Sequence, residues 1–184
     1  MAADQIIVHL AEGFEEIEAV TVIDVLRRAG LNVISVSVTD KHLVKGVHHI
    51  HIMADKLFDE VDYTKGRMLI LPGGMPGAKN LDSHAGLKSQ IMEYYTSEKY
   101  LAAICAAPMV FGNLGILKGK SAVCYPGFES HLKEAEVVYE PVTTSGKIVT
   151  GRGVGAALEF SLEIVKLFLG GDASENLRKA MLVV

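Results

Sequence analysis

Hydrophobic positions in this chain alternate between short apolar runs and helical repeats. Gln5 to Leu10 is an apolar run of strand length, and residues 31–38 form a second run rich in β-branched side chains. Between them, residues 15–29 place apolar side chains at spacings of three and four, with acids at the start and Arg27-Arg28 followed by Gly30 at the end. Strand, helix and strand in succession predict a βαβ unit, and therefore a parallel sheet with helices on its faces.

The same alternation continues to the end of the chain. Residues 45–53 predict a side strand or a hairpin, and further strands are expected at 67–71, 100–104, 121–125, 137–142 and 147–150. Helices are expected at 86–96, 156–169 and 173–181. The pattern predicts a single α/β domain over residues 1–184, built as a three-layer sandwich around a mainly parallel sheet. In such sheets, ligands bind beyond the carboxyl ends of the strands.

Composition narrows the classes of function. The formal charge of −4 is not gathered into blocks, so nothing favours binding to nucleic acid or to an anionic membrane. The longest uncharged run, residues 101–117, is interrupted by Gly and Pro and is shorter than the roughly 20 residues of a spanning helix. With only two cysteines, Cys105 and Cys124, and no signal-like N-terminus, the sequence favours the reducing cytoplasm.

The chemistry of the chain centres on Cys105. The predicted strand 100–104 ends at this cysteine, and a small-residue helix follows from Pro108. The turn would hold the thiol out of the sheet, and the positive end of the helix would favour its thiolate. A plain buried cysteine is the competing interpretation, and this stretch alone leaves both open.

Two other strand ends meet the same edge of the predicted sheet. Glu18 shares a helical line with Val22 and Val25, so it should face inward, where burial raises the pKa of a carboxyl group; Glu15 and Glu16 could reach water or cap the helix. Gly73 and Gly74 follow the strand 67–71, and their backbone N–H groups, with that of Ala106, could bind an oxyanion. A helix-capping acid and a tight glycine turn are the structural alternatives.

Four spaced motifs together resemble those of the ThiJ/PfpI superfamily. They are Glu15-Glu16-Ile17-Glu18, Leu71-Pro72-Gly73-Gly74, Ala103-Ile104-Cys105-Ala106-Ala107-Pro108 and Thr150-Gly151-Arg152-Gly153. The branch that contains the parkinsonism-associated deglycase and its bacterial relatives is the most similar. This resemblance implies a flavodoxin-like fold, a homodimer, no cofactor, Cys105 as an oxidisable nucleophile and Glu18 as a protonated neighbour.

Two departures from the superfamily's patterns narrow the activity. The amidase branch carries a histidine directly after the cysteine, where this chain has Ala106, so a Cys/His dyad is missing and peptide hydrolysis is disfavoured. Many relatives have a His-Pro step where this chain has Tyr125-Pro126, and a phenol is a poor base near neutral pH. The resemblance therefore implies a glyoxalase- or deglycase-like enzyme acting on small reactive carbonyls. The alternative is an oxidative-stress sensor or redox-regulated chaperone that uses the same cysteine.

Three further patterns are weaker. Gly151-x-Gly153-x-x-Ala156 partly mimics a dinucleotide fingerprint, but no acid-ended strand follows it, and close helix packing explains the glycines. His49 and His51 alternate on a presumed strand without a third ligand, so we predict no metal site. Cys124 is interpreted as a core residue of a strand, with a resolving thiol as the weaker alternative.

Overall fold

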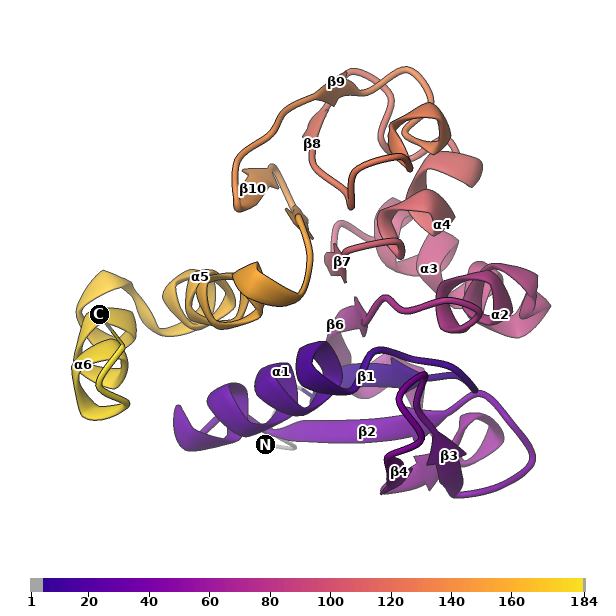
Figure 1. Cartoon of the computed structure of the whole chain (residues 1–184), viewed down its shortest axis with the longest axis horizontal. Helices are drawn as coiled ribbons and strands as arrows, with labels where there is room; N and C mark the ends of the chain where they lie inside the picture. Colours follow the sequence, from indigo (N-terminus) through magenta and orange to yellow (C-terminus); the bar gives the residue numbers. More distant parts are fainter. Residues whose placement is uncertain (1–4, 184) are drawn as a thin grey trace.

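A seven-stranded sheet forms the middle layer of the structure, a computed structural model that describes residues 5–183 (Figure 1). Its strands are β1 (Gln5–Leu10), β2 (Val33–Ser37), β5 (Lys56–Leu57), β6 (Gly66–Leu71), β7 (Tyr100–Ile104), β10 (Val142–Ser145) and β11 (Ile148–Gly151). They are arranged in the order β10-β11-β7-β6-β1-β2-β5, and every neighbouring pair is parallel except β10 with β11. The mainly parallel sheet expected from the βαβ pattern is therefore confirmed.

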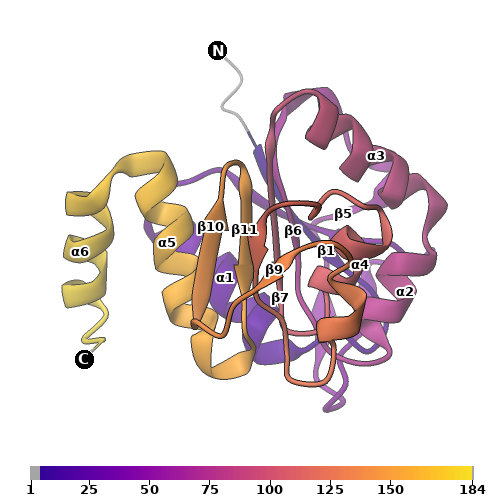
Figure 2. The same cartoon turned by 90° about the horizontal axis from the view of Figure 1, so that it is seen from above.

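Helices cover both faces of this sheet. The helices are α1 (Glu16–Arg28), α2 (Gly77–Ser83), α3 (Ala85–Thr96), α4 (Pro108–Asn113), α5 (Ala157–Leu169) and α6 (Gly171–Ala180). In Figure 2, α1 and α5 lie on one face and α2, α3 and α4 on the other, while α6 packs outside α5, away from the sheet. Among the described residues, no helix is both long and apolar enough to cross a membrane.

Strand β1 shows why the two faces form separate cores. Ile6 and Val8 pack into the core under α1 and α5, whereas Ile7 packs into the core under α2, α3 and α4. Successive side chains of a strand point to opposite faces, so a strand buried on both faces needs an almost continuous apolar run. Each such fully buried side chain contributes roughly 1.5–3 kcal/mol relative to exposure. The apolar residues of β1, interrupted only by the buried His9 before Leu10, are the sequence signature of this central position.

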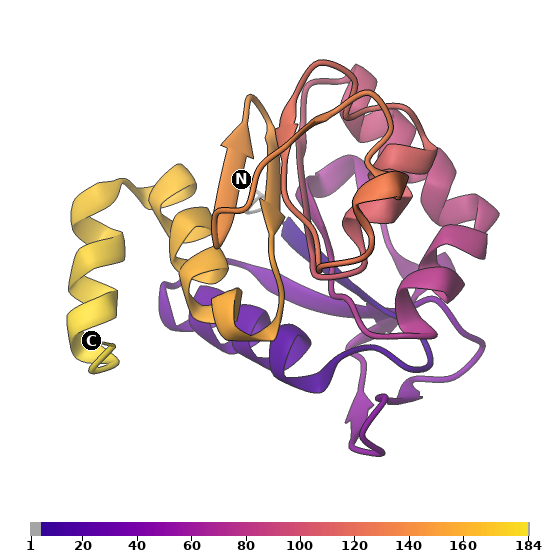
Figure 3. The ribbon, with the colours of Figure 1, turned by 45° about the horizontal axis from the view of Figure 1, so that its top comes forward.

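A small antiparallel hairpin stands beside the main sheet. It pairs β3 (Leu43–Lys45) with β4 (His51–Met53), which confirms the hairpin alternative for this region. Figure 3 shows this hairpin, in purple, projecting from the body near the start of α1. His49 has a φ of 68° in the turn and does not belong to either strand, so the expected alternation of His49 and His51 on one strand is wrong.

The region after α4 departs most from the expected elements. The strand expected at 121–125 is only β8 (Ser121–Ala122), and the strand expected at 137–142 divides into β9 (Glu136–Val137) and the start of β10. Two hydrogen bonds explain the short β8: Val123 N–H donates to the Thr150 hydroxyl, and Tyr125 N–H donates to the Cys105 carbonyl. Cys124 therefore lies in an irregular segment, and helix α2 was not predicted at all.

The topology brings three strand ends to one place. β1, β6 and β7 are neighbours in the sheet, and they end at Leu10, Leu71 and Ile104. From β1 the chain moves outward to β2, whereas from β6 it moves the opposite way to β7. In α/β proteins, ligands bind beyond the carboxyl ends of the strands at such a reversal of strand order, here between β1 and β6.

Candidate active site

Cys105 occupies a strained turn between β7 and α4. Its φ of 65° lies in the left-handed region that non-glycine residues rarely adopt. Two hydrogen bonds hold this conformation: Cys105 N–H donates to the Gly151 carbonyl at 2.9 Å, and Tyr125 N–H donates to the Cys105 carbonyl at 2.8 Å. The residue is only 8% exposed, and its side chain packs in the core under α1 and α5. The structure thus places the thiol on an elbow at the sheet edge, where the sequence predicts it.

Glu18 comes from the first turn of α1 and is completely buried. Its Oε2 accepts a hydrogen bond from Gly73 N–H at 2.8 Å, while Oε1 has no partner among the described residues. Gly73 also marks how closely Glu18 and Cys105 approach: a Cβ on Gly73 would lie 2.6 Å from Cys105 Cβ and 2.8 Å from Glu18 Oε2. The acid and the sulfur residue therefore converge on the same backbone position.

Burial raises the pKa of Glu18 to about 7. The Gly73 N–H and a hydrogen bond with Cys105 oppose this rise in pKa, whereas the charge of Glu15 adds to it. A buried carboxylate oxygen without a partner is costly, so the proton is retained at pH values where an exposed glutamate is ionised. Glu18 can accordingly gain or lose a proton near neutral pH.

Burial also raises the pKa of Cys105, to about 12, with the charge and hydrogen bond of Glu18 as the next causes. The N–H groups of Gly74 and Ala106 act in the opposite direction. The direction of this shift is opposite to the one expected from the helix end, because burial and the neighbouring carboxylate act against the thiolate.

Glu18 and Cys105 are best treated as one titrating pair. At pH values between about 7 and about 12, the pair holds a single proton, which either the carboxyl group or the sulfur can carry. The thiol can then become a nucleophile when its proton passes to the neighbouring carboxylate. This arrangement needs no metal ion and no imidazole to activate the sulfur.

The glycine turn supplies the backbone donors of the site. Gly74 has a φ of 87°, and a Cβ there would lie 2.6 Å from the Gly13 carbonyl oxygen, so only glycine lets the turn approach the start of α1 this closely. Glu15 N–H donates to the Gly73 carbonyl at 3.0 Å and fixes the turn. The N–H groups of Gly74 and Ala106 then face the sulfur from two sides, as donors to an oxyanion would.

Replacing Gly73 by alanine is expected to disrupt the site. The new Cβ would overlap Cys105 Cβ, Glu18 Oε2 and the Ile104 carbonyl, so these groups must move apart. We expect a loss of roughly 1–3 kcal/mol in the free energy of unfolding and at least a tenfold slower reaction of Cys105 with iodoacetamide. Gly171→Ala is the matched control, because nothing lies within 4 Å of its Cβ position, and it should change neither quantity.

The raised pKa of Glu18 also predicts a pH-dependent stability. A carboxyl group with a pKa near 4.5 in the unfolded chain and about 7 in the fold stabilises the fold fully below about pH 4.5, and this contribution is lost as pH rises to about 7. The loss should be about 3 kcal/mol. Urea unfolding of Glu18→Gln should show a correspondingly flatter pH profile over this range; an unchanged profile would contradict the raised pKa.

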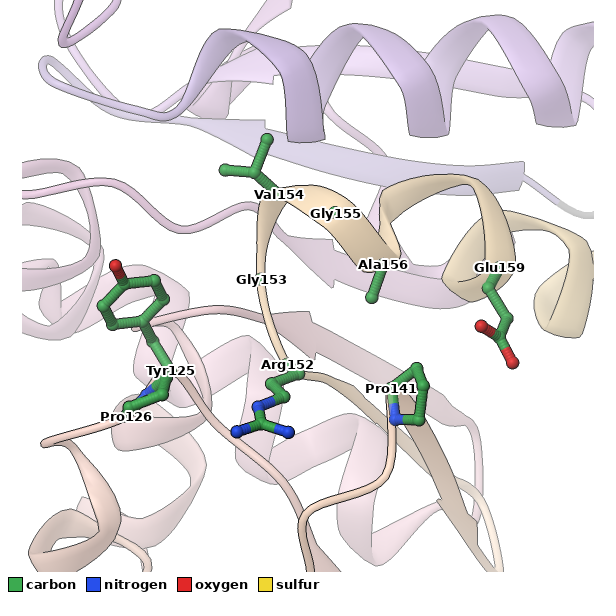
Figure 4. A pocket seen from close by; sticks show the side chains of 9 residues that line it. All are labelled: Tyr125, Pro126, Pro141, Arg152, Gly153, Val154, Gly155, Ala156 and Glu159. Atoms are coloured by element: carbon green, nitrogen blue, oxygen red, sulfur yellow. The ribbon is translucent and has the colours of Figure 1, made fainter.

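Tyr125 lies beside the site, and it is about half exposed to solvent. Its ring packs over Gly153, where a Cβ would lie 3.1 Å from the ring. Figure 4 shows its side chain on one side of a cavity of about 560 Å³, across from Glu159. The phenol therefore takes a place beside the elbow of Cys105, where it can contact a ligand.

Cys124 and the histidines do not join Cys105. Cys124 is buried in the core under α2, α3 and α4, whereas Cys105 belongs to the other core, and both thiols are free. This confirms the interpretation of Cys124 as a core residue. His51 is exposed on β4, and His49 is exposed in the hairpin turn.

The capping role expected for Glu15 is confirmed, whereas the burial of Glu15 and Glu16 and the pairing of Glu16 with His48 were not predicted. Both side chains are buried: Glu15 caps α1 by accepting from Glu18 N–H at 2.7 Å, and Glu16 accepts from His48 N–H at 2.7 Å and pairs with its ring. Within residues 5–183, Glu15, Glu16 and His48 form the one group whose atoms could together hold a metal ion. Three acids at a helix start were the available signal, but the hairpin that covers them was not foreseeable from the sequence.

Comparison with known proteins shows the family of the chain. The model of the DJ-1/PfpI family matches residues 4–167. Protein dj-1beta of Drosophila melanogaster is 32% identical over 179 residues, which cover 96% of each chain, and Protein DJ-1 homolog B of Arabidopsis thaliana is 38% identical over 97% of this chain. The chain spans 41% and 46% of the two Arabidopsis relatives, less than half of each.

A solved structure extends the likeness to the fold. The structure of oxidized Toxoplasma gondii DJ-1 superposes with a TM-score of 0.94 at 35% identity and covers 98% of both chains. The flavodoxin-like fold implied by the four motifs is thereby confirmed, together with the family that they indicate. This chain belongs to the DJ-1/PfpI family.

Proposed function

We propose that this protein is a cofactor-independent enzyme that converts small α-oxoaldehydes, such as methylglyoxal, into α-hydroxy acids. The observation that supports this proposal is the convergence of Cys105 and Glu18 on Gly73, with the Gly74 and Ala106 N–H groups facing the sulfur. A nucleophile, a proton carrier near its working pKa and two oxyanion donors are the groups that such a reaction requires. Early adducts of these aldehydes with amines are related substrates.

The reaction begins with addition to the aldehyde. The sulfur of Cys105 forms a bond to the aldehyde carbon, the thiol proton passes to Glu18, and the carbonyl oxygen becomes an oxyanion that the Gly74 and Ala106 N–H groups stabilise. Proton return from Glu18 to that oxygen gives a hemithioacetal. The carboxylate, now without its proton, is again available as a base.

Glu18 then moves a proton between two carbons. It removes the hydrogen from the former aldehyde carbon and the resulting enediol is protonated at the neighbouring carbon, so the first carbon is oxidised to a thioester while the second is reduced to an alcohol. Water hydrolyses the thioester, releasing lactate from methylglyoxal and regenerating the thiol. The net change is the addition of one water, with no external oxidant or reductant.

The test is the fate of methylglyoxal with the purified wild-type protein. We expect lactate to form in a one-to-one ratio with the methylglyoxal consumed, in buffer free of thiols and added metals. Loss of methylglyoxal without lactate would mean simple adduct formation on the protein. No loss of methylglyoxal would refute the proposed activity.

Redox sensing is the second candidate function, and the same donors favour it. Two equivalents of peroxide convert a thiol to a sulfinate and release two waters, and the Gly74 and Ala106 N–H groups with a protonated Glu18 would stabilise its oxygens. The relative from Toxoplasma gondii has been crystallised in an oxidized state. Intact mass after limited peroxide separates the candidates: selective gain of two oxygens at Cys105, without methylglyoxal turnover, would favour the sensor. A cysteine amidase stays disfavoured because Ala106 replaces the histidine of such a dyad.

We also propose that the protein is a cytoplasmic homodimer. Ile17 and Val20 on α1 and Ile50 and Met53 on the hairpin are large apolar side chains that are about half or more exposed. Such side chains gathered on neighbouring elements are typical of a surface that another protein covers. Light scattering should give twice the 19.8 kDa chain mass, and Val20→Glu should lower it toward one chain.

A further inference from the structure

A cavity lies beside the turn that carries Cys105, and apart from Tyr125 its lining residues take no part in the mechanism above. It is bounded by Tyr125 and Pro126 on one side, by Pro141 and Arg152 on another, and by the start of α5 up to Glu159 on the third (Figure 4). Its volume of about 560 Å³ falls within the range of small-molecule sites. We refer to it as the Arg152 pocket.

Two backbone hydrogen bonds tie the Arg152 pocket to the sulfur residue. One wall begins at Tyr125, whose N–H donates to the Cys105 carbonyl, and the other follows Gly151, whose carbonyl accepts from Cys105 N–H. Tyr125 is therefore a direct hydrogen-bond partner of Cys105, and Arg152 directly follows a second partner, Gly151. A ligand bound here lies beside the elbow on which the sulfur stands.

Arg152 is the one cation among the residues that line this pocket. Its Nη1 donates to the Tyr139 carbonyl at 2.9 Å, and its backbone N–H donates to the Pro141 carbonyl at 2.9 Å, so the residue is anchored to the neighbouring segment 139–141. Among residues 5–183, no carboxylate lies within 4.0 Å of the guanidinium, and Glu159 forms no ion pair with it. The remaining donors of the guanidinium fork are thus available to an anion.

The size of the pocket exceeds what methylglyoxal needs. Methylglyoxal has five non-hydrogen atoms and no charge. It would therefore fill only a small part of the cavity and offers no anionic group to Arg152. We propose that the Arg152 pocket is a recognition subsite for a carboxylate, and that the preferred substrates are α-oxoaldehydes carrying a carboxylate a few bonds from the reacting carbonyl. This inference rests on the proposed function and names its substrate class. Arg152 is a recognition residue in this scheme and takes no part in proton transfer.

The probe substrate is 4,5-dioxopentanoate, which is methylglyoxal extended by a CH₂–COO⁻ arm, and the neutral comparison is 2-oxohexanal, of similar length. Wild type should show a kcat/KM at least about tenfold higher for the anion than for the neutral chain, since only the anion can form a charge-assisted bidentate contact with the guanidinium. Added salt should reduce this preference. The product expected from the anion is 2-hydroxyglutarate.

Arg152→Gln should abolish the preference for the anion by lowering kcat/KM for 4,5-dioxopentanoate at least about tenfold. Arg152→Lys should retain part of it, because an ammonium keeps the charge but lacks the planar fork. Glu159→Gln is the matched control, since it removes a charge from the same pocket without touching the guanidinium, and it should preserve or increase the preference. Equal kcat/KM for both substrates in wild type, or an unchanged preference in Arg152→Gln, would overturn the proposed subsite.

A binding measurement separates this inference from the proposed reaction. In Cys105→Ala, which cannot react, calorimetry should detect 4-oxopentanoate but not its uncharged amide, and Arg152→Gln in the same background should lose the binding. Binding of this kind by a protein that turns over no oxoaldehyde would refute the reaction and leave the subsite standing. Turnover of neutral oxoaldehydes with no binding of 4-oxopentanoate would refute the subsite and leave the reaction standing.

Discussion

Replacing Cys105 by serine is expected to lower kcat/KM for methylglyoxal by at least about 10³-fold. A serine hydroxyl is a far weaker nucleophile than a thiol, and Glu18, whose pKa is about 7, cannot remove a proton from an alcohol to any useful extent. The backbone conformation at this position should survive, because its N–H still donates to the Gly151 carbonyl and its carbonyl still accepts from Tyr125 N–H. Lactate formation at matched protein concentration is the measurement.

Cys124→Ser is the control for this substitution. Cys124 is the only other cysteine of the chain, it is buried in the opposite core, and it lies outside the site. Its turnover should stay within about twofold of wild type once the sample is shown to be folded. Wild-type turnover in Cys105→Ser, or an equal loss in both variants, would remove Cys105 from the mechanism.

Replacing Glu18 by glutamine is expected to reduce kcat for methylglyoxal by about 10²–10⁴-fold, the usual contribution of a general acid–base group. The amide oxygen can still accept the Gly73 N–H, so the loop and the buried position should be preserved. What the amide cannot do is take the thiol proton or carry it between the two carbons. KM should change much less than kcat, because the lost interaction belongs to the transition state.

Glu16→Gln serves as the comparison for Glu18→Gln. Glu16 is another buried acid of the same helical turn, but it faces the hairpin and accepts the N–H of His48. Its substitution should affect the free energy of unfolding more than kcat. Equal kcat losses in the two variants would show that the helix start, and not the proton of Glu18, limits the reaction.

Much of the fold could be predicted because its central strands are buried on both faces. β1, β6 and β7 must be apolar at nearly every position, and that run is legible without any knowledge of neighbours. The two-residue strands β8 and β9 are different, since their ends are decided by hydrogen bonds to Thr150 and Cys105, residues distant in sequence. No local pattern encodes such partners, so the strands expected there were too long.

The position of the candidate site could be predicted from the sequence, but the direction of the pKa shift of its cysteine could not. The carboxyl ends of parallel strands share an edge, so Cys105, Glu18 and Gly73 could be brought together from topology alone. The pKa of Cys105 depends on how deeply the sulfur is buried and on the charge of Glu18, and a sequence shows neither. The helix-dipole argument therefore gave the wrong direction for the thiol, while the inward position of Glu18 gave the right direction for the acid.

The sequence showed Arg152 within a motif, but its surroundings could not be predicted. It was visible as part of the fourth motif, but its surroundings come from three separate segments around residues 125, 141 and 159. Only the folded chain shows that its guanidinium is anchored to Tyr139 and left without an acidic partner within the described residues.

The most direct test of a proton shared by Cys105 and Glu18 is the rate of Cys105 alkylation by iodoacetamide as a function of pH, followed by intact mass. Wild type should show a first rise in rate near pH 7, when the pair loses one proton, and a second toward pH 12. Glu18→Gln should lose the rise near pH 7 and show a single step, below about 12, because the carboxylate charge no longer opposes the thiolate. A step near pH 7 that persists in Glu18→Gln, or a wild-type profile with one ordinary thiol step near pH 9, would contradict the shared proton.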